Sequence, residues 1–242
     1  MTQARQILVL WDIDRTLLYV GDIDRQVYRD TFAEIVGRPA ERLPARGTGV
    51  TMPLAIRSLL LDNGVRQADV PRLLPSMVKR LPQRLAAHAE DLREQGILLP
   101  GALDALKTVQ EQPNYIPTVV TGNLKPSALL KLQAFGLDRF LDTEIGGYSS
   151  DDDHRPALVG IAQKRAQTKH ETAFARSNTV ILGDSLEDVR TGLEGGASVI
   201  GVASGKTSAE ELASAGADLV LQSLEDVPRL LDAITTVTLE RA

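Results

Sequence analysis

Two aspartates, Asp12 and Asp14, follow a short apolar run over residues 7–11. The run is rich in large apolar side chains and too brief for a core helix, so it predicts a buried strand. Side chains alternate along a strand, and a spacing of two can therefore place both carboxylates on one side of its carboxyl end. Carboxylates at that edge of an open α/β sheet can act as nucleophiles or as acid–base groups. An isolated Asp-x-Asp is also typical of an ordinary strand-to-loop transition.

Two later strands are predicted to end in polar clusters as well. In a doubly wound sheet the carboxyl ends of the central strands meet at one crevice, so we expect these clusters to converge on the two aspartates. Arg155, in a loop before a predicted helix, could reach the same crevice. The clusters are Thr121-Gly122-Asn123, after a strand expected over 116–120, and Gly183-Asp184 with Asp188 four residues on, after a strand expected over 179–182.

Each of these residues also has an ordinary structural interpretation. Thr121 could cap a helix, and Arg155 could be a solvated loop charge. Asp184 and Asp188 could lie at a helix N-terminus, where negative charge is favourable. A shared site is favoured because polar clusters recur at the same end of several predicted strands.

The elements that must position these side chains fall into two regions. Between residues 19 and 95 the sequence predicts helices and no strand, whereas from residue 100 strands alternate with helices. This alternation implies a parallel sheet with right-handed crossovers. We therefore predict an α/β fold with a doubly wound parallel sheet as the core domain, residues 1–17 and 96–242, and an all-helical cap domain inserted at 18–95.

Some local predictions are more specific. The first helix is expected to end at Gly37, because glycine can adopt the left-handed conformation that stops a helix. A stretch over 68–94 contains three prolines and is predicted to be divided into two or three helices. A short strand is expected over 143–146, and residues 235–242 are expected to form a loosely held tail.

Composition excludes several classes of site. The 242 residues include no cysteine and three histidines, which excludes disulfides and thiolate chemistry and disfavours a histidine-rich metal site. The net charge of -5 and the scattered arginines provide no basic field for nucleic acid. No apolar stretch approaches the ~20 residues that a membrane span needs, and the N-terminal residues lead into the first predicted strand without a cleavage site. We therefore expect a cytoplasmic protein that binds neither nucleic acid nor a membrane.

The order of four short motifs resembles that of the haloacid dehalogenase superfamily, most of whose members are phosphatases. The motifs are D-I-D-R-T-L from Asp12, V-V-T-G-N ending at Asn123, H-R-P around Arg155, and V-I-L-G-D-S-L-E-D from Val180. The resemblance covers the predicted core, and a helical insertion after the first motif is similar to the cap of phosphoglycolate phosphatase-like members. Arg15 departs from the pattern, because the family most often has glycine there. We predict that Arg15 makes a contact across the boundary between core and cap.

The resemblance implies a phosphatase that depends on Mg²⁺ and forms an aspartyl-phosphate. It assigns the nucleophile to Asp12 and the role of general acid and base to Asp14. Mg²⁺ is a hard ion that prefers oxygen ligands, and the implied ligands are Asp12, Asp184 and the backbone carbonyl of Asp14. Thr121 and Arg155 are implied as further catalytic residues.

Binding of the phosphoryl group is implied for a set of hydroxyl, amide and guanidinium groups. Arg155 would neutralise charge on the phosphoryl oxygens in the transition state, with Lys125 and Lys164 as alternatives for this basic role. Asp188 would orient the basic residue or a metal-bound water without itself contacting the substrate. The implied phosphate-binding residues are Thr16, Thr121, Gly122, Asn123 and Arg155.

The cap is expected to select the substrate by covering the crevice. Within residues 46–49 the glycines allow close backbone approach, and Arg46 together with Thr48 could bind a second anionic group. A surface loop without such a role is the alternative. The implied partner is a small phosphorylated metabolite such as phosphoglycolate, while sugar phosphates and nucleoside monophosphates stay open.

Other functions fit the sequence less fully or cannot be distinguished from a phosphatase by its motifs. A true dehalogenase would leave Asp14 and Asp184 without a purpose, because a departing halide needs neither a proton nor a metal. A phosphomutase shares every motif and differs in retaining its product, and a catalytically silent member would bind phosphate or a partner without turnover. A nucleotide-binding P-loop is disfavoured, because residues 201–207 miss the GxxxxGK[ST] spacing by one.

Overall fold

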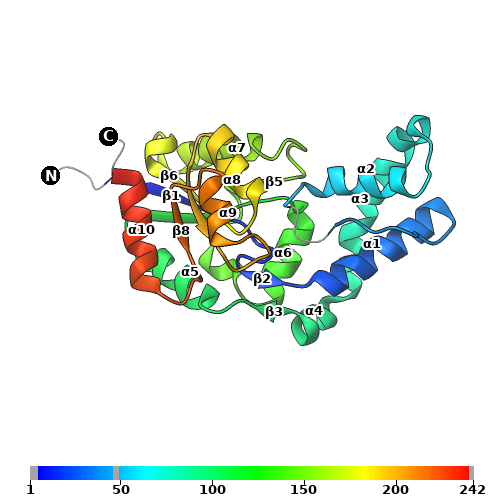
Figure 1. The fold of residues 1–242 in the computed structure, drawn as a ribbon, viewed down its shortest axis with the longest axis horizontal. Coiled ribbons are helices and arrows are strands. Elements are labelled where there is room, and N and C mark those ends of the chain that lie inside the picture. Colours follow the sequence, from blue (N-terminus) through cyan, green and yellow to red (C-terminus); the bar gives the residue numbers. More distant parts are fainter. Residues whose placement is uncertain (1–4, 46–48, 240–242) are drawn as a thin grey trace.

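Six parallel strands form the main sheet of the computed structural model, which describes residues 5–45 and 49–239 (Figure 1). The strands are β1 (Ile7–Trp11), β4 (Tyr115–Thr121), β5 (Gly147–Tyr148), β6 (Thr179–Gly183), β7 (Ser198–Val202) and β8 (Leu219–Leu221). Their order is β5-β4-β1-β6-β7-β8, so the chain starts in the middle of the sheet and winds outward in both directions. The predicted doubly wound α/β fold is confirmed.

Both faces of the sheet are covered by helices, which explains why β1 is apolar without interruption. Ile7, Val9 and Trp11 belong to one buried apolar cluster, whereas Leu8 and Leu10 belong to a second. The first cluster is completed by α5 (Ala102–Glu111), α6 (Lys125–Ala134) and α10 (Val227–Leu239). The second is completed by α7 (Ala157–His170), α8 (Leu186–Gly195) and α9 (Ala209–Ser214).

Four further helices lie together to one side of the sheet (Figure 1). They are α1 (Gly21–Val36), α2 (Met52–Asp62), α3 (Val70–Ala87) and α4 (Ala89–Gln95). Helix α1 ends as predicted at Gly37, which has a φ of 82° and donates its backbone N–H to Ala33. Apolar side chains of these helices join the first cluster, so the helices are packed onto the same apolar core as one face of the sheet.

A small antiparallel ribbon lies where the chain enters and leaves these four helices. β2 (Leu18–Tyr19) pairs with β3 (Ile97–Leu98), and the backbone N–H of Leu99 donates to Leu17 at 3.0 Å. The expectation of no strand from residue 19 is therefore wrong at Tyr19. Two-residue strands carry no periodicity that a sequence pattern can detect, and the pairing partner lies far along the chain.

The 68–94 stretch is divided into two helices, as predicted, but the division does not fall at a proline. Helix α3 runs through Pro75 and Pro82, and the break falls at His88, before α4. An interior proline costs roughly 3 kcal/mol in helix propensity, but here a buried stripe at helical spacing holds the helix together. That stripe consists of Leu73, Met77, Leu81 and Leu85.

Two other local predictions are wrong. Thr143 and Glu144 lie in a turn, and the strand expected there begins only at Gly147, where β5 pairs with β4. Residues 235–239 of the expected tail belong to α10, where Val237 is buried and its carbonyl accepts a hydrogen bond from Ser198 at 3.1 Å, and residues 240–242 lie outside the described residues. Among the described residues no helix is both long enough and apolar enough to cross a bilayer.

Candidate active site

The carboxyl ends of β1, β4 and β6 meet at one edge of the sheet. Asp12 follows β1, Thr121 ends β4 and Asp184 follows β6. Trp11 is in register with Val119 on one side and with Leu182 on the other, so the three strands end close to level with one another. A cavity of about 150 Å³ lies over this edge and is also lined by residues of α1, α2 and the segment before α2.

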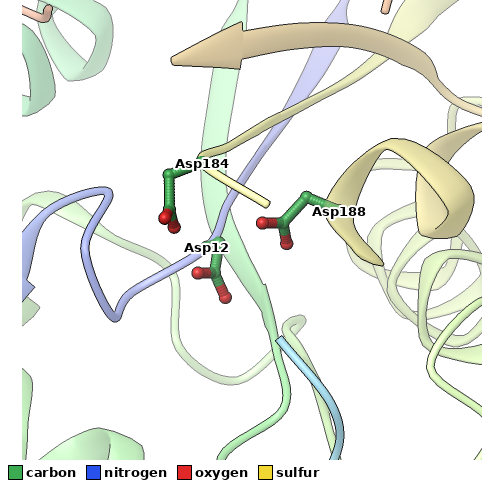
Figure 2. A group of neighbouring side chains, drawn as sticks. All are labelled: Asp12, Asp184 and Asp188. Atoms are coloured by element: carbon green, nitrogen blue, oxygen red, sulfur yellow. The ribbon is translucent and has the colours of Figure 1, made fainter. Parts of the chain in front are cut away.

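Three buried carboxylates form an acidic cluster at this edge. Oxygen atoms of Asp12, Asp184 and Asp188 lie within 4.8 Å of one another, and Figure 2 shows the three side chains as close neighbours. Such a set of hard oxygen donors fits a divalent cation such as Mg²⁺. Gly205 packs against the cluster, since a Cβ atom there would lie 1.6 Å from Oδ2 of Asp184. The loop after β7 can therefore approach the carboxylate only with glycine at this position.

Burial and mutual repulsion disfavour the charged forms of these aspartates. Burial raises the pKa of Asp184 to about 7, with a further rise from Asp188 and an opposing effect from Arg15 and Arg155. The pKa of Asp12 is raised well above its ordinary value, first by burial and then by Asp188, while Arg155 opposes the rise. A bound cation would relieve this repulsion, so the electrostatics agree with the donor set.

Arg155 supplies the positive charge inside the acidic cluster. Its side chain is 2% exposed, and Nη2 donates to Asp12 at 2.6 Å and to Asp188 at 2.5 Å. The two other candidates for the basic role lie elsewhere, because Lys164 is exposed on α7 and Lys125 pairs with Glu144 at 3.2 Å. Of the three, the structure brings only Arg155 to Asp12.

A capping box at the start of α8 fixes Asp188. The Ser185 hydroxyl donates to Oδ2 of Asp188 at 2.6 Å and accepts from the Asp188 backbone N–H at 3.2 Å. The other carboxylate oxygen, Oδ1, accepts from Arg155. Asp188 therefore caps a helix N-terminus and pairs with Arg155 at the same time, so its structural and functional interpretations are compatible.

The carboxylate of Asp14 has a separate set of partners. Lys131 Nζ donates to both of its oxygens, at 2.8 and 3.0 Å, and Asn123 Nδ2 donates to Oδ2 at 2.7 Å. The same ammonium group contacts Asp24 of α1 at 2.8 Å and the side-chain oxygen of Asn123 at 3.0 Å. We refer to Asp14, Asp24, Asn123 and Lys131 as the lysine cluster.

Sequence reasoning missed Lys131. Burial alone would lower the pKa of this lysine, but Asp14 and Asp24 raise it above its ordinary value, so the ammonium form is retained. The available signal was its position in α6, where Ala128 and Leu132 are buried on the same helix face. A lysine on an apolar face indicates a buried partner.

The Thr121-Gly122-Asn123 turn packs against the segment that precedes α2, at Gly49 and Val50. Thr121 Oγ1 accepts from Asn123 Nδ2 at 2.9 Å, which leaves the hydroxyl proton available to a ligand. The Gly122 carbonyl accepts from Met52 at 2.8 Å, and a Cβ on Gly122 would lie 2.7 Å from the Val50 carbonyl oxygen. Only glycine permits this close crossing of the two backbones.

The remaining predicted phosphate-binding residues fall into two groups. Thr16 is buried beside the acidic cluster, where its hydroxyl donates to Asp184 at 3.3 Å. Arg46 and Thr48 lie outside the described residues. The next residue, Gly49, has a φ of 68° and its carbonyl accepts from Arg155, so this end of the segment reaches the acidic cluster.

Arg15 adopts a backbone conformation that favours glycine. Its φ is 66°, and the conformation is held by a hydrogen bond from its N–H to Leu18 at 2.6 Å and by one from the Ser204 hydroxyl to its carbonyl at 2.7 Å. The guanidinium carbon lies 4.2 Å from the ring centroid of Tyr19 in β2. Arg15 thus contacts a residue beyond the predicted boundary at residue 17.

Solved structures share this fold over nearly the whole chain. A hydrolase from Pseudomonas syringae is 21% identical with a TM-score of 0.65, and the match covers 95% of this chain and 99% of that one. A haloacid dehalogenase-like hydrolase from Bacteroides fragilis is 22% identical with a TM-score of 0.69, over 92% and 100% of the two chains. A protein described as a phosphoglycolate phosphatase, from Lactobacillus plantarum, is 17% identical with a TM-score of 0.64, over 94% and 100%. At these identities the likeness establishes the fold.

Sequence comparison identifies the family. No curated protein sequence matches the chain. The sequence model of the family described as haloacid dehalogenase-like hydrolase matches residues 9–192, a stretch that contains all four motifs and both clusters. The chain therefore belongs to the haloacid dehalogenase-like hydrolase family.

Proposed function

We propose that the protein is a Mg²⁺-dependent phosphatase that hydrolyses a small phosphorylated metabolite through an aspartyl-phosphate. The observation that carries this proposal is the acidic cluster with Arg155 bound to Asp12, at the carboxyl edge of the sheet. A carboxylate can attack a phosphate ester only when positive charge offsets the repulsion between two anions. Arg155 supplies one such charge, and the acidic cluster fits a cation that would supply another.

Mg²⁺ would be held by Asp12 and Asp184, with the backbone carbonyl of Asp14 as a further ligand. Asp188 belongs to the same cluster but is engaged by Arg155 and Ser185, so we assign it to orienting Arg155. When bound, Mg²⁺ would neutralise charge on the phosphoryl group and on the two aspartates. The donor set and the raised pKa of Asp184 support this assignment.

The transfer of the phosphoryl group would use both clusters in each of two steps. Arg155 holds Oδ1 of Asp12, and Oδ2 attacks phosphorus while the bond to the leaving oxygen breaks and Asp14, which enters this step in its protonated form, gives that oxygen its proton. Water then attacks the aspartyl-phosphate, Asp14 takes its proton, and phosphate departs as Asp12 is regenerated. The Thr121 hydroxyl and the N–H groups near Gly122 would donate to the phosphoryl oxygens.

Helices α1–α4, within residues 18–95, would form the cap that encloses the substrate. The small cavity volume supports a small metabolite, and residues from α1 and α2 line it opposite the sheet edge. Phosphoglycolate is of suitable size, and Arg46 and Thr48 stay candidates for binding a second anionic group. A cytoplasmic location, predicted from the sequence, stays a prediction.

The test is hydrolysis of p-nitrophenyl phosphate and a panel of phosphorylated metabolites, with Mg²⁺ and with EDTA. We expect turnover that requires Mg²⁺ and that falls by at least ~10³-fold in Asp12→Asn, because the nucleophile is lost. Turnover that survives both EDTA and the substitution would contradict the mechanism. Binding of phosphate analogues without any turnover would identify a silent member, and conversion of a substrate to its isomer would identify a phosphomutase.

A further inference from the structure

Lys131 is a buried cation that the proposed reaction does not yet use. Its side chain is 1% exposed, and Nζ lies within 3.0 Å of four oxygen atoms from Asp14, Asp24 and Asn123. An ammonium group has three protons, so these acceptors share it. A buried lysine is costly unless it is paired, and the lysine cluster pairs it fully.

The cluster fixes the direction in which Asp14 faces. Lys131 and Asn123 bind the Asp14 carboxylate from the α6 side, yet the Asp14 side chain is still 36% exposed, and Asp14 and Lys131 both line the cavity. One side of the carboxylate therefore accepts hydrogen bonds from Lys131 and Asn123, while another side faces the cavity. An ion pair between Lys131 and Asp14 that served only to neutralise charge in the core would not require Asp14 to be exposed to the cavity.

The same ammonium group joins three parts of the chain that the reaction needs together. Lys131 lies on α6, which begins two residues after Asn123, so it is anchored to the turn that carries the proposed phosphate-binding groups. Asp24 lies in the first turn of α1, whose residues line the cavity where the organic part of a substrate would extend. Asp14 sits between these two elements.

We propose that Lys131 is a positioning residue that aims Asp14 at the leaving oxygen of the substrate, and that Asp24 holds Lys131 in place from α1. This inference rests on the proposed function. It predicts that disrupting the lysine cluster lowers kcat/KM more for a leaving group that must be protonated than for one that departs as an anion. A p-nitrophenolate leaves without one, whereas an alkoxide does not.

The first test compares kcat/KM for p-nitrophenyl phosphate and for a simple alkyl phosphate in Lys131→Met. Loss of general acid catalysis is worth ~10²–10⁴-fold, so we expect a fall of about 10²-fold with the alkyl phosphate and under about threefold with p-nitrophenyl phosphate. A role confined to stability would lower both values equally. Lys169→Met is the matched control, because Lys169 pairs with Asp142 at 2.6 Å on the surface of α7, and both values should stay unchanged.

Two further variants keep the test decisive. If Lys131→Met does not fold, Asp24→Asn removes only the partner on α1, and the alkyl phosphate should lose about tenfold while p-nitrophenyl phosphate is little affected. In an Asp14→Asn background, adding Lys131→Met should cost no further activity with the alkyl phosphate, since the group it positions is already gone.

The outcomes separate the two proposals. A wild-type protein without Mg²⁺-dependent phosphatase activity overturns the proposed function and this inference with it. A wild-type protein that is active, with variants that lose both substrates equally or neither, overturns the role of Lys131 alone.

Discussion

Asp12 and Asp14 are two residues apart and lie in different electrostatic surroundings. Asp12 shares Arg155 with Asp188 in a cluster of three carboxylates, whereas Asp14 shares Lys131 with Asp24 and also accepts a hydrogen bond from the Asn123 amide. With three carboxylates to one guanidinium the first cluster has room for a further positive charge, whereas in the lysine cluster one ammonium group contacts both carboxylates directly. Residues two apart on an extended stretch lie on the same side, so the two carboxylates differ through their partners, which are Arg155 for Asp12 and Lys131 with Asn123 for Asp14.

The largest effect is expected for Arg155→Met. This change removes the charge that touches the proposed nucleophile, and loss of one such donor typically costs ~10²–10³-fold. We expect kcat/KM to fall by about 10³-fold with p-nitrophenyl phosphate and with an alkyl phosphate alike, as measured by steady-state kinetics on protein whose fold is checked by circular dichroism. A split between the two substrates like that of Lys131→Met would break the comparison between the clusters.

A smaller effect is expected where the segment before α2 crosses Gly122. In Gly122→Ala the new Cβ would lie 2.7 Å from the Val50 carbonyl, and the displaced segment carries Gly49, which reaches Arg155. We expect KM for p-nitrophenyl phosphate to rise about tenfold. Gly160→Ala is the control, since nothing lies within 4 Å of a Cβ on Gly160 of α7, and a gain of about 0.5–1 kcal/mol in unfolding free energy with unchanged kinetics is expected.

Mg²⁺ binding should stabilise the protein in a pH-dependent way. Because the pKa of Asp184 rises from 3.8 to about 7, its proton stabilises the folded protein at acidic pH, and this contribution is lost as pH rises through about 7. Mg²⁺ competes with that proton. At a concentration a hundredfold above Kd we expect a rise in Tm of about 5–10 °C at pH 8 and a much smaller rise at pH 5.5, measured by differential scanning fluorimetry.

Two variants connect this measurement to the comparison between the clusters. Asp184→Asn should abolish the Mg²⁺-dependent rise in Tm, while Lys131→Met should retain it. A rise in Tm that is equal at both pH values would show that Mg²⁺ does not bind at Asp184.

The smallest effect concerns Arg15, whose side chain contacts β2 while its backbone is strained. Arg15→Ala loses the contact with Tyr19 and keeps the positive φ, whereas Arg15→Gly loses the contact and relieves the strain. We expect Arg15→Gly to be more stable than Arg15→Ala by about 1 kcal/mol in urea unfolding. Equal stabilities would show that the left-handed conformation carries no strain.

The acidic cluster could be predicted because each member follows a detectable strand. Asp12 and Asp184 stand at the ends of apolar runs, and the rule that parallel strands converge at their carboxyl ends places them together. Asp188 follows by helical spacing within one motif. The fold class was predictable for the same reason, since strand and helix periodicities are local signals.

The lysine cluster could not be predicted because it depends on contacts between distant parts of the chain. Nothing near Lys131 indicates that Asp14 and Asp24 lie opposite it, more than 100 residues away in sequence. The ribbon of β2 and β3 escaped detection because each strand has two residues, and α3 continues through its prolines because tertiary packing overrides local propensity.

The ribbon has a mechanical consequence. It holds the two chain crossings between the sheet and helices α1–α4 side by side, so a rotation of these helices would have to pivot about residues 17–19 and 97–99 together. In a rigid rotation, displacement grows with distance from the axis. Asp24 lies one turn into the helix that follows the ribbon and would move little, whereas more distant parts of the helices would swing farther. Such a rotation would therefore preserve the contact of Lys131 with Asp24, and with it the contacts of Lys131 with Asp14.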